Sequence, residues 1–272
     1  MVKYITLCAD DYGQNPEISQ AIVDLIYKKV LTASSCMTSS VHWLEQAKSL
    51  IILKDQVDLG LHFNLTEGSP LVMSTQFYSL EKLMIHSFLH RLDKIAIEAE
   101  LNAQIDQFIA GIGQLPDFID GHQHVHQLPV IRDILIKVYN ARFRSSGIYI
   151  RSLLDFQFFS YVNATAYFKK CIIQASGCYA FKKLLMAHHI PHNTSFAGIY
   201  HFKNSIQYSQ FFTQFLQQIT DGGLIMCHPG KMGKNDSIAK ARYDEYQFFS
   251  SDLFLKLNKQ SEVIMTRFNH KK

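Results

Sequence analysis

The sequence lacks the features that mark several broad classes of protein. It has no apolar run of the roughly 18 residues that a membrane span needs. It has no cluster of Lys and Arg interleaved with aromatic residues, the pattern that indicates nucleic-acid binding. It also has no linker, low-complexity tract or clear internal repeat. We therefore expect a globular protein with neither a membrane nor a nucleic-acid partner.

Cysteine is scarce and scattered. No CxxC pair occurs among the five cysteines, and Cys8, Cys36 and Cys227 lie inside apolar runs, where a free cysteine acts as a small hydrophobic side chain. The apolar residues 4–8 are too few for the core of a signal peptide. We therefore expect reduced thiols and a cytoplasmic location.

What the sequence does contain is an ordinary globular composition. Apolar residues make up 47% of the chain and charged residues 18%, with a formal net charge of +4. These values are far from those of disordered chains. Apolar runs suited to buried strands alternate with amphipathic helical patterns along the chain. This order predicts an α/β fold with a parallel sheet, in a single domain covering residues 1–272.

The expected elements follow from periodicity and from residues that begin or end helices. Asn15 can cap a helix whose first residue is Pro16. Expected strands cover residues 3–9, 32–38, 57–65, 119–122, 147–151, 223–227 and 263–265. Expected helices cover residues 16–26, 42–53, 79–90, 93–111, 128–142, 206–219 and 242–258. Residues 153–205 give no clear pattern.

The most informative stretch is residues 120–126, in which three histidines occupy every second position behind Asp120 and a glycine. If this segment is extended, period-2 geometry places His122, His124 and His126 on one face. A polar strand end with solvated histidines is the simpler interpretation. The density of imidazoles beside a carboxylate favours a metal or acid–base site instead.

Three further polar groups follow apolar strands directly: the pair Asp10 and Asp11, then His62, then His228. Groups at the carboxyl ends of parallel strands meet at one edge, in a (β/α) barrel and in a doubly wound sheet alike. Adjacent carboxylates can divide their roles, one binding a cation and one serving as a base, although they can also simply cap a helix. His228 is held in front of a proline, which suits either a catalytic acid or a turn.

Together these motifs resemble those of the YdjC-like carbohydrate deacetylases, a family that includes chitooligosaccharide deacetylases and HpnK-type proteins. The matching segments, in the order and spacing of that family, are residues 9–13 (ADDYG), 60–66 (GLHFNLT), 120–126 (DGHQHVH) and 228–230 (HPG). Tyr12 and Gly121 depart from the family pattern without removing a candidate ligand. The resemblance covers nearly the whole chain and implies a distorted (β/α) TIM-like barrel.

By motif position, the resemblance implies one divalent metal ion bound by Asp11, His62 and His122. Nitrogen ligands favour Zn²⁺ or another transition ion, whereas the resemblance implies Mg²⁺, so the identity of the metal stays open. We also expect Asp120 to orient His122 through the second nitrogen of its ring.

The resemblance further implies that Asp10 is the general base and that His228 protonates the leaving amine. His124 and His126 would line the pocket or support the ligands. The implied function is that of a metal-dependent hydrolase that removes N-acetyl groups from an N-acetylated sugar or oligosaccharide. A homodimer is expected from the resemblance alone.

Other functions fit the same residues. The chain could be a metal-dependent amidase on a non-sugar substrate, a 2-His-1-carboxylate iron enzyme, or a non-catalytic sugar- or metal-binding protein. Trp43 and the aromatic residues of 153–212 offer stacking faces for sugar rings, although aromatic residues at helical spacing more often belong to a core.

Overall fold

The computed structural model describes residues 2–154, 174–202, 207–233 and 236–268. The strands are β1 (Lys3–Tyr12), β2 (Ala33–Cys36), β3 (Asp58–Phe63), β4 (Phe118–Gly121), β5 (Tyr149–Ile150), β6 (Phe196–Ala197), β7 (Leu224–Cys227) and β8 (Val263–Met265). The helices are α1 (Pro16–Tyr27), α2 (Trp43–Ile51), α3 (Leu80–Phe88), α4 (Lys94–Ile112), α5 (Ile131–Arg142), α7 (Tyr179–Ala187), α8 (Tyr208–Gln218), α9 (Ala239–Phe249) and α10 (Asp252–Gln260). Two short helical turns, η1 (His122–Gln127) and η2 (Gln174–Cys178), complete the described elements.

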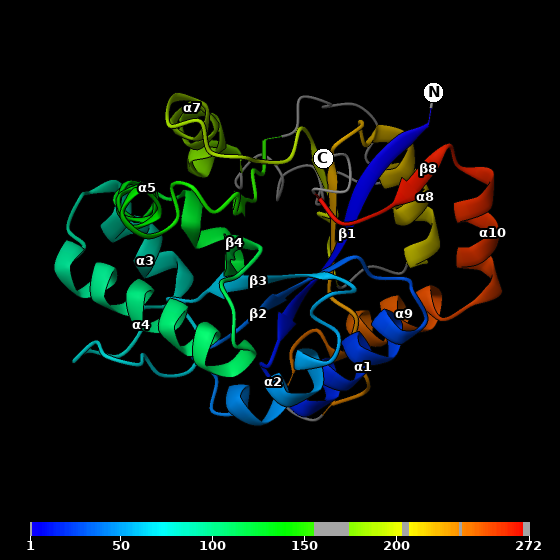
Figure 1. Ribbon diagram of the computed structural model, residues 1–272, viewed down its shortest axis with the longest axis horizontal. Helices are drawn as coiled ribbons and strands as arrows, with labels where there is room; N and C mark the ends of the chain where they lie inside the picture. The colour runs from blue at the N-terminus through cyan, green and yellow to red at the C-terminus, as the bar shows by residue number, and fades with distance from the viewer. Residues whose placement is uncertain (1, 155–173, 203–206, 234–235, 269–272) are drawn as a thin grey trace.

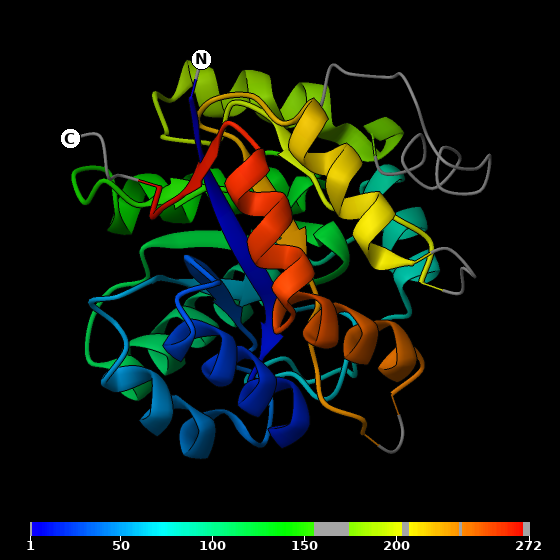
Figure 2. The same ribbon diagram turned by 90° about the vertical axis from the view of Figure 1, so that its right-hand side faces the viewer.

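These strands form one curled parallel sheet with β1 near its middle. The order is β5-β4-β3-β2-β1-β7-β6, and β8 pairs with residues 3–5 at the start of β1. Every strand pair is parallel. Helices surround the sheet, with α1 and α2 below it, α3 to α5 on the left and α8 to α10 on the right in Figure 1, and Figure 2 shows α10 crossing in front of β1. The predicted α/β class and distorted (β/α) barrel are confirmed.

The barrel has a seam between β5 and β6, which do not pair with each other in the described part of the chain. The Asn193 side chain spans this seam. Its Oδ1 accepts a hydrogen bond from Ser152 N at 2.7 Å, and its Nδ2 donates to Ser152 O and Ser195 O, each at 2.8 Å. One amide group therefore fastens the segment after β5 to the segment before β6.

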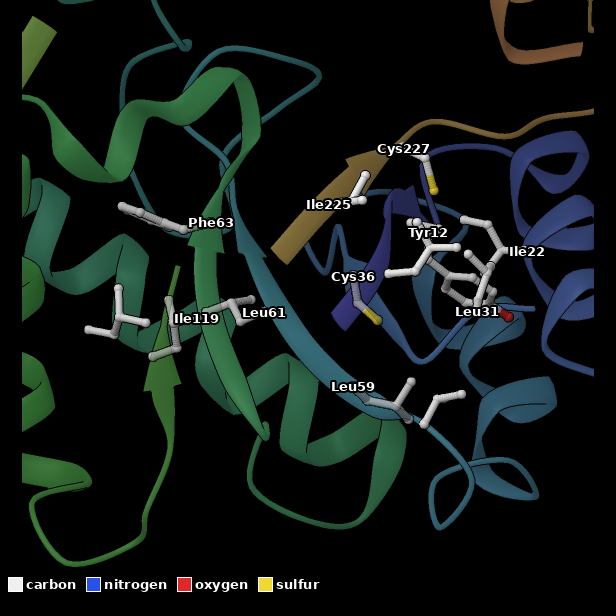
Figure 3. Close-up of a cluster of buried hydrophobic side chains, with 14 of the residues drawn as sticks. Tyr12, Ile22, Leu31, Cys36, Leu59, Leu61, Phe63, Ile119, Ile225 and Cys227 are labelled. Carbon is white, nitrogen blue, oxygen red and sulfur yellow. The ribbon is translucent and has the colours of Figure 1, made fainter. Parts of the chain in front are cut away.

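The core has two layers because strand residues alternate between the faces of the curled sheet. Leu59 and Leu61 of β3 belong to the larger apolar cluster, part of which Figure 3 shows. Gly60, between them, faces the inner cluster, where a Cβ atom would lie 2.4 Å from the Phe118 ring. His62 continues this inner row, so the alternation that buries the leucines also directs His62 into the barrel.

Most helix boundaries follow the sequence signals. Asn15 Oδ1 accepts a hydrogen bond from Ile18 N at 2.9 Å and caps α1, as predicted. The predicted single helix over residues 242–258 is wrong, because the Ser251 side chain accepts a hydrogen bond from Phe254 N and starts a new helix. No helix among the described residues is both long and apolar enough to cross a bilayer. Residues 155–173 and 203–205 of the region without a clear pattern, and residue 206 of the next expected helix, lie outside the described residues.

Candidate metal and catalytic site

The two adjacent aspartates lie on a bulge in β1. The strand continues three residues beyond its predicted end, and its register with β2 shifts between Ala9 and Tyr12. Asp11 has a left-handed φ of 69°, which asparagine and aspartate tolerate better than most residues. In a regular strand successive side chains face opposite ways, whereas here Asp10 and Asp11 both line one cavity. The bulge therefore brings both carboxylates to one site.

Asp11 lies between the two predicted histidine ligands. Its Oδ1 is 3.2 Å from His62 Nε2 and 3.0 Å from His122 Nδ1. One donor atom from each of the three residues lies within 4.8 Å of the others, and all three are buried. Two imidazoles and one carboxylate form a three-ligand set of the kind that leaves coordination positions open for catalysis. These residues fit a divalent metal ion.

The second ring nitrogen of His62, Nδ1, is hydrogen-bonded to two buried side chains. Asp120 Oδ1 is 2.7 Å from His62 Nδ1, and Ser35 Oγ lies 3.0 Å from the same nitrogen. Ser35 also donates to Asp120 Oδ1 at 2.5 Å. His62 and Asp120 are partners in the register of β3 with β4, so their side chains emerge side by side. The expectation that Asp120 orients His122 is therefore wrong, since strand pairing places it against His62.

His122 is held instead by Glu67, a residue that the sequence analysis did not identify. Glu67 Oε2 is 2.9 Å from His122 Nε2, and Glu67 Oε1 accepts a hydrogen bond from Gln14 Nε2 at 2.7 Å. Glu67 lies on the loop after β3, between the expected strand over residues 57–65 and the expected helix over residues 79–90. Its position directly after the predicted third strand is the only signal that could have found it.

A buried arginine, Arg151, contacts both the predicted base Asp10 and Asp120, the carboxylate that holds His62. Arg151 Nη1 and Nη2 donate to the two carboxylate oxygens of Asp10 at 2.7 and 2.6 Å, and Nη2 also lies 2.6 Å from Asp120 Oδ2. Arg151 is completely buried. It follows β5 directly, so the same strand-end rule that identified Asp10 could have identified it.

A second arginine pairs with the metal-ligand carboxylate. Arg242 Nη2 of α9 donates to Asp11 Oδ2 at 2.7 Å, and Arg242 Nε donates to Asp236 Oδ2 at the same distance. Burial alone would raise the pKa of Asp11, but Arg242 and His122 hold it well below its usual range. Asp11 is therefore an anion, as a metal ligand must be.

The neighbouring imidazole is charged for a related reason. Burial alone would lower the pKa of His62, but nearby carboxylates, chiefly Asp120, raise it to about 10. His62 Nε2 therefore carries a proton that faces Asp11 Oδ1. A metal ion bound between these two residues would have to replace that proton.

The three histidines of residues 120–126 do not share one face, so that prediction is wrong. β4 ends at Gly121, and Gln123 and His124 have left-handed φ values of 51° and 63° in η1. His122 reaches Asp11, and His124 lines the cavity. His126 lies in the interior, where its Nε2 donates to Arg151 O at 3.0 Å and burial lowers its pKa to about 4.

His228, the predicted acid, comes at the end of β7 and lines the same cavity. Its backbone N–H donates to Glu245 Oε2 at 2.5 Å, and the edge of its ring faces Phe202, with centroids 5.3 Å apart. Glu245 also accepts a hydrogen bond from the Tyr200 hydroxyl at 2.5 Å. The pKa of Glu245 is raised to about 7 by burial, against the effect of these two donors.

Comparison with known proteins identifies the family. A profile described as YdjC-like protein matches residues 4–260. The chain belongs to the YdjC-like protein family. This result confirms the resemblance inferred from the motifs.

Relatives of this YdjC-like chain have names that concern carbohydrates. A carbohydrate deacetylase of Danio rerio is 31% identical over 147 residues, which cover 49% of this chain and 45% of the fish protein. A chitooligosaccharide deacetylase of Yersinia pestis (strain Pestoides F) is 31% identical over 136 residues, or 48% of this chain and 53% of that protein. The chain thus spans about half the length of the curated relatives it matches.

A solved structure supports the fold of the YdjC-like chain. An Enterococcus faecalis protein, provisionally named for cleavage of cellobiose phosphate, superposes with a TM-score of 0.71 at 18% identity. The match covers 98% of both chains. At this identity the likeness concerns the fold alone.

The cavity of the YdjC-like chain has a volume of about 920 Å³. Its polar wall carries Asp10, Asp11 and the two histidines beside them, and its other walls include Tyr200 and Phe202. Trp43 is not part of it, because this side chain is buried against Phe108 and donates to Gln107 O at 2.9 Å. Trp43 is therefore a core residue, the more common role of such aromatic residues, and offers no stacking face for a sugar ring.

Proposed function

We propose that this chain is a metal-dependent hydrolase that removes N-acetyl groups from an N-acetylated sugar or oligosaccharide. The observation that carries the proposal is the convergence of Asp11, His62 and His122, with Asp10 beside them, on one large cavity. The names of the curated relatives support a carbohydrate as the substrate.

The chemistry divides between a metal and the residues of the chain. A divalent ion held by Asp11, His62 and His122 would polarise the acetamide carbonyl and lower the pKa of a water molecule beside it. Asp10 accepts the proton of that water as its oxygen adds to the carbonyl carbon. His228 donates a proton to the nitrogen as the C–N bond breaks, and the products are acetate and a free amino sugar.

Arg151 prepares Asp10 for this role. Its paired hydrogen bonds fix the orientation of the carboxylate, so Asp10 cannot turn towards Asp11 and act as a further ligand. Asp10 and Asp11 thus have separate roles because separate arginines bind them.

The test is acetate release from N-acetylglucosamine, diacetylchitobiose and longer chitooligosaccharides. The enzyme is stripped of metal and reloaded with Mg²⁺ or Zn²⁺, which also decides between these ions. We expect metal-dependent release that falls at least ~10²-fold in Asp10→Asn, with metal still bound. Asp106→Asn, at an exposed carboxylate paired with Arg142, is the matched control and should keep full activity.

Other outcomes would replace this proposal. Loss of metal in a folded Asp10→Asn variant would overturn the division of roles between the aspartates. No release from any sugar at full metal occupancy would redirect the search to other N-acyl substrates or to a binding protein. Activity that requires iron and a co-substrate would indicate oxygen chemistry.

We also propose a cytoplasmic location, which the four free, buried cysteines of the described residues support. A homodimer stays a prediction from the resemblance, and sedimentation of the purified chain tests it.

A further inference from the structure

The two imidazoles beside Asp11 are held by the backbone in different ways. His62 lies inside β3, paired on one side with β2 and on the other with β4. His122 lies beyond the last residue of β4, in a turn whose next two residues have left-handed φ values. No strand pairing fixes the backbone of His122, so the orientation of its ring depends more heavily on side-chain contacts.

Those contacts assign each nitrogen of His122 a separate partner. Nδ1 faces Asp11 Oδ1 at 3.0 Å, and Nε2 faces Glu67 Oε2 at 2.9 Å. His62 has the opposite arrangement, with Nε2 towards Asp11 and Nδ1 towards Asp120. The two histidines therefore present different nitrogens to the same carboxylate oxygen.

Glu67 is held rigidly enough to fix the ring. Asn64, which is completely buried, accepts hydrogen bonds from Thr66 N and Glu67 N at 3.0 and 3.1 Å. Asn64 Nδ2 also donates to Glu67 O at 2.6 Å. This Asn64-centred turn fixes the backbone of Glu67, although the Glu67 side chain is 48% exposed at the cavity.

Glu67 is also part of a closed ring of hydrogen bonds. Gln14 donates to Glu67 Oε1 at 2.7 Å and accepts from Arg242 Nη2 at 3.1 Å. Arg242 donates to Asp11 Oδ2, and Asp11 Oδ1 is hydrogen-bonded to His122 Nδ1. The contact of His122 Nε2 with Glu67 Oε2 closes the ring. Both oxygens of Glu67 are occupied within this ring, Oε1 by Gln14 Nε2 and Oε2 by His122 Nε2.

We propose that Glu67 is a positioning residue that holds the His122 imidazole by Nε2 and thereby makes Nδ1 the metal-ligating atom. His62 ligates through Nε2, so the site combines two kinds of imidazole ligation. A hydrogen-bonded carboxylate behind a ligating histidine fixes the tautomer and orientation of the ring. This inference rests on the metal site of the proposed function but not on the substrate or on the deacetylation.

The test compares Glu67→Ala and Glu67→Gln with wild type, using Zn²⁺ alone as the probe. Affinity is measured by competition with a chromophoric chelator. Long-range ¹H–¹⁵N spectra report which nitrogen of His122 holds the metal and which holds the proton. Glu98→Ala is the matched control, because Glu98 is a carboxylate paired with Lys137 at the surface, away from the cavity.

We expect wild type to show His122 ligated through Nδ1 with a proton on Nε2. Glu67→Ala should bind Zn²⁺ about 10- to 100-fold more weakly and lose the single Nε2–H signal. Glu67→Gln keeps an oxygen that can accept the Nε2–H bond, so it should recover most of the affinity. Glu98→Ala should match wild type. This rescue distinguishes positioning from a general loss of structure.

Ligation through Nε2 in wild type, or equal affinity in Glu67→Ala and Glu98→Ala, would overturn the role of Glu67. If Glu67→Ala fails to fold, the Glu67→Gln spectrum still decides, since a ring ligated through Nε2 there contradicts the proposal. Absence of Zn²⁺ binding in wild type would instead overturn the proposed metal site itself. The two failures are therefore distinguishable.

Discussion

The two histidines beside Asp11 are oriented by different kinds of residue. On the buried side, His62 is oriented by Asp120 and Ser35, which are both completely buried on neighbouring strands. On the open side, His122 is oriented by Glu67, a half-exposed residue on a loop. Strand register thus supplies one support, and a loop side chain held by the Asn64-centred turn supplies the other.

This difference should determine whether the residues on each side contribute mainly to the stability of the fold or mainly to the position of the metal ligands. On the buried side, Arg151, Asp10 and Asp120 are charges removed from water, so losing one leaves its partners uncompensated. On the open side, water can solvate whatever remains after a substitution, and exposed ion pairs contribute little to stability. We therefore expect buried-side changes to affect folding and open-side changes to affect mainly the ligands.

The largest effect should follow from Arg151→Met. This change leaves two buried carboxylates without their cation, which should lower the free energy of unfolding by about 3–5 kcal/mol in denaturant titrations. Arg142→Met, which breaks an exposed pair with Asp106, is the matched control and should cost less than about 1 kcal/mol. Equal losses in the two variants would remove the contrast between buried and exposed charge.

Acid should destabilise the buried side through His126. Burial lowers the pKa of His126 from its ordinary 6.5 to about 4. Between these values the unfolded chain binds the proton and the folded chain does not, so stability is present above pH 6.5 and is lost as the pH falls. The loss should approach about 3 kcal/mol near pH 4.

The measurement is the difference between wild type and His126→Gln in denaturant titrations from pH 7 to pH 4. Glutamine can still donate to Arg151 O but does not titrate. The stability of wild type should fall relative to the variant on acidification. Parallel curves would show that His126 is not the group responsible.

Ser35→Ala should have a smaller effect on the same side. It removes a short hydrogen bond to an ionised Asp120, for a cost of about 1–2 kcal/mol. The neighbouring Ser34→Ala is a close control, because Ser34 is equally buried but donates to a neutral carbonyl, Ala9 O, at 3.2 Å. A larger loss in Ser34→Ala would contradict the importance assigned to the charged acceptor.

The smallest effect on stability should come from Gln14→Ala on the open side. This change opens the hydrogen-bonded ring but leaves Glu67 in contact with His122, and we expect a change of at most about 0.5 kcal/mol. Zn²⁺ affinity should fall by less than in Glu67→Ala. A loss of stability exceeding that of Ser35→Ala would show that the open side supports the fold as well.

The sequence predicted the parts of the site that depend on local pattern. Asp11, His62 and His122 lie at or just after the carboxyl ends of apolar strands, and parallel strands bring such positions to one edge whatever the details of the barrel. The N-cap at Asn15 is similarly local. His228 reaches the cavity for the same reason, while its role as an acid stays a prediction.

The parts of the site that the sequence analysis missed or predicted wrongly depend on contacts between distant segments of the chain. Arg242 lies on a helix, where an arginine normally indicates a solvated face, and only the position of α9 beside α1 in the fold brings it to Asp11. The pairing of Asp120 with His62 required the register of two strands. The turn after Gly121 could not be predicted from the period-2 spacing of the histidines. That spacing does not depend on backbone conformation, so it does not reveal the left-handed φ of Gln123 and His124.

The position of β1 in the sheet has a consequence for protein synthesis. β1 is translated well before its partners β7 and β8, which lie more than 200 residues further along the chain. Non-local pairing must wait for the chain that it joins, which slows folding and exposes apolar strands meanwhile. Ribosome-bound chains stopped before residue 224 should therefore be digested readily by protease, unlike the released protein. Asp10 and Asp11 are therefore synthesised long before His228, which lines the same cavity.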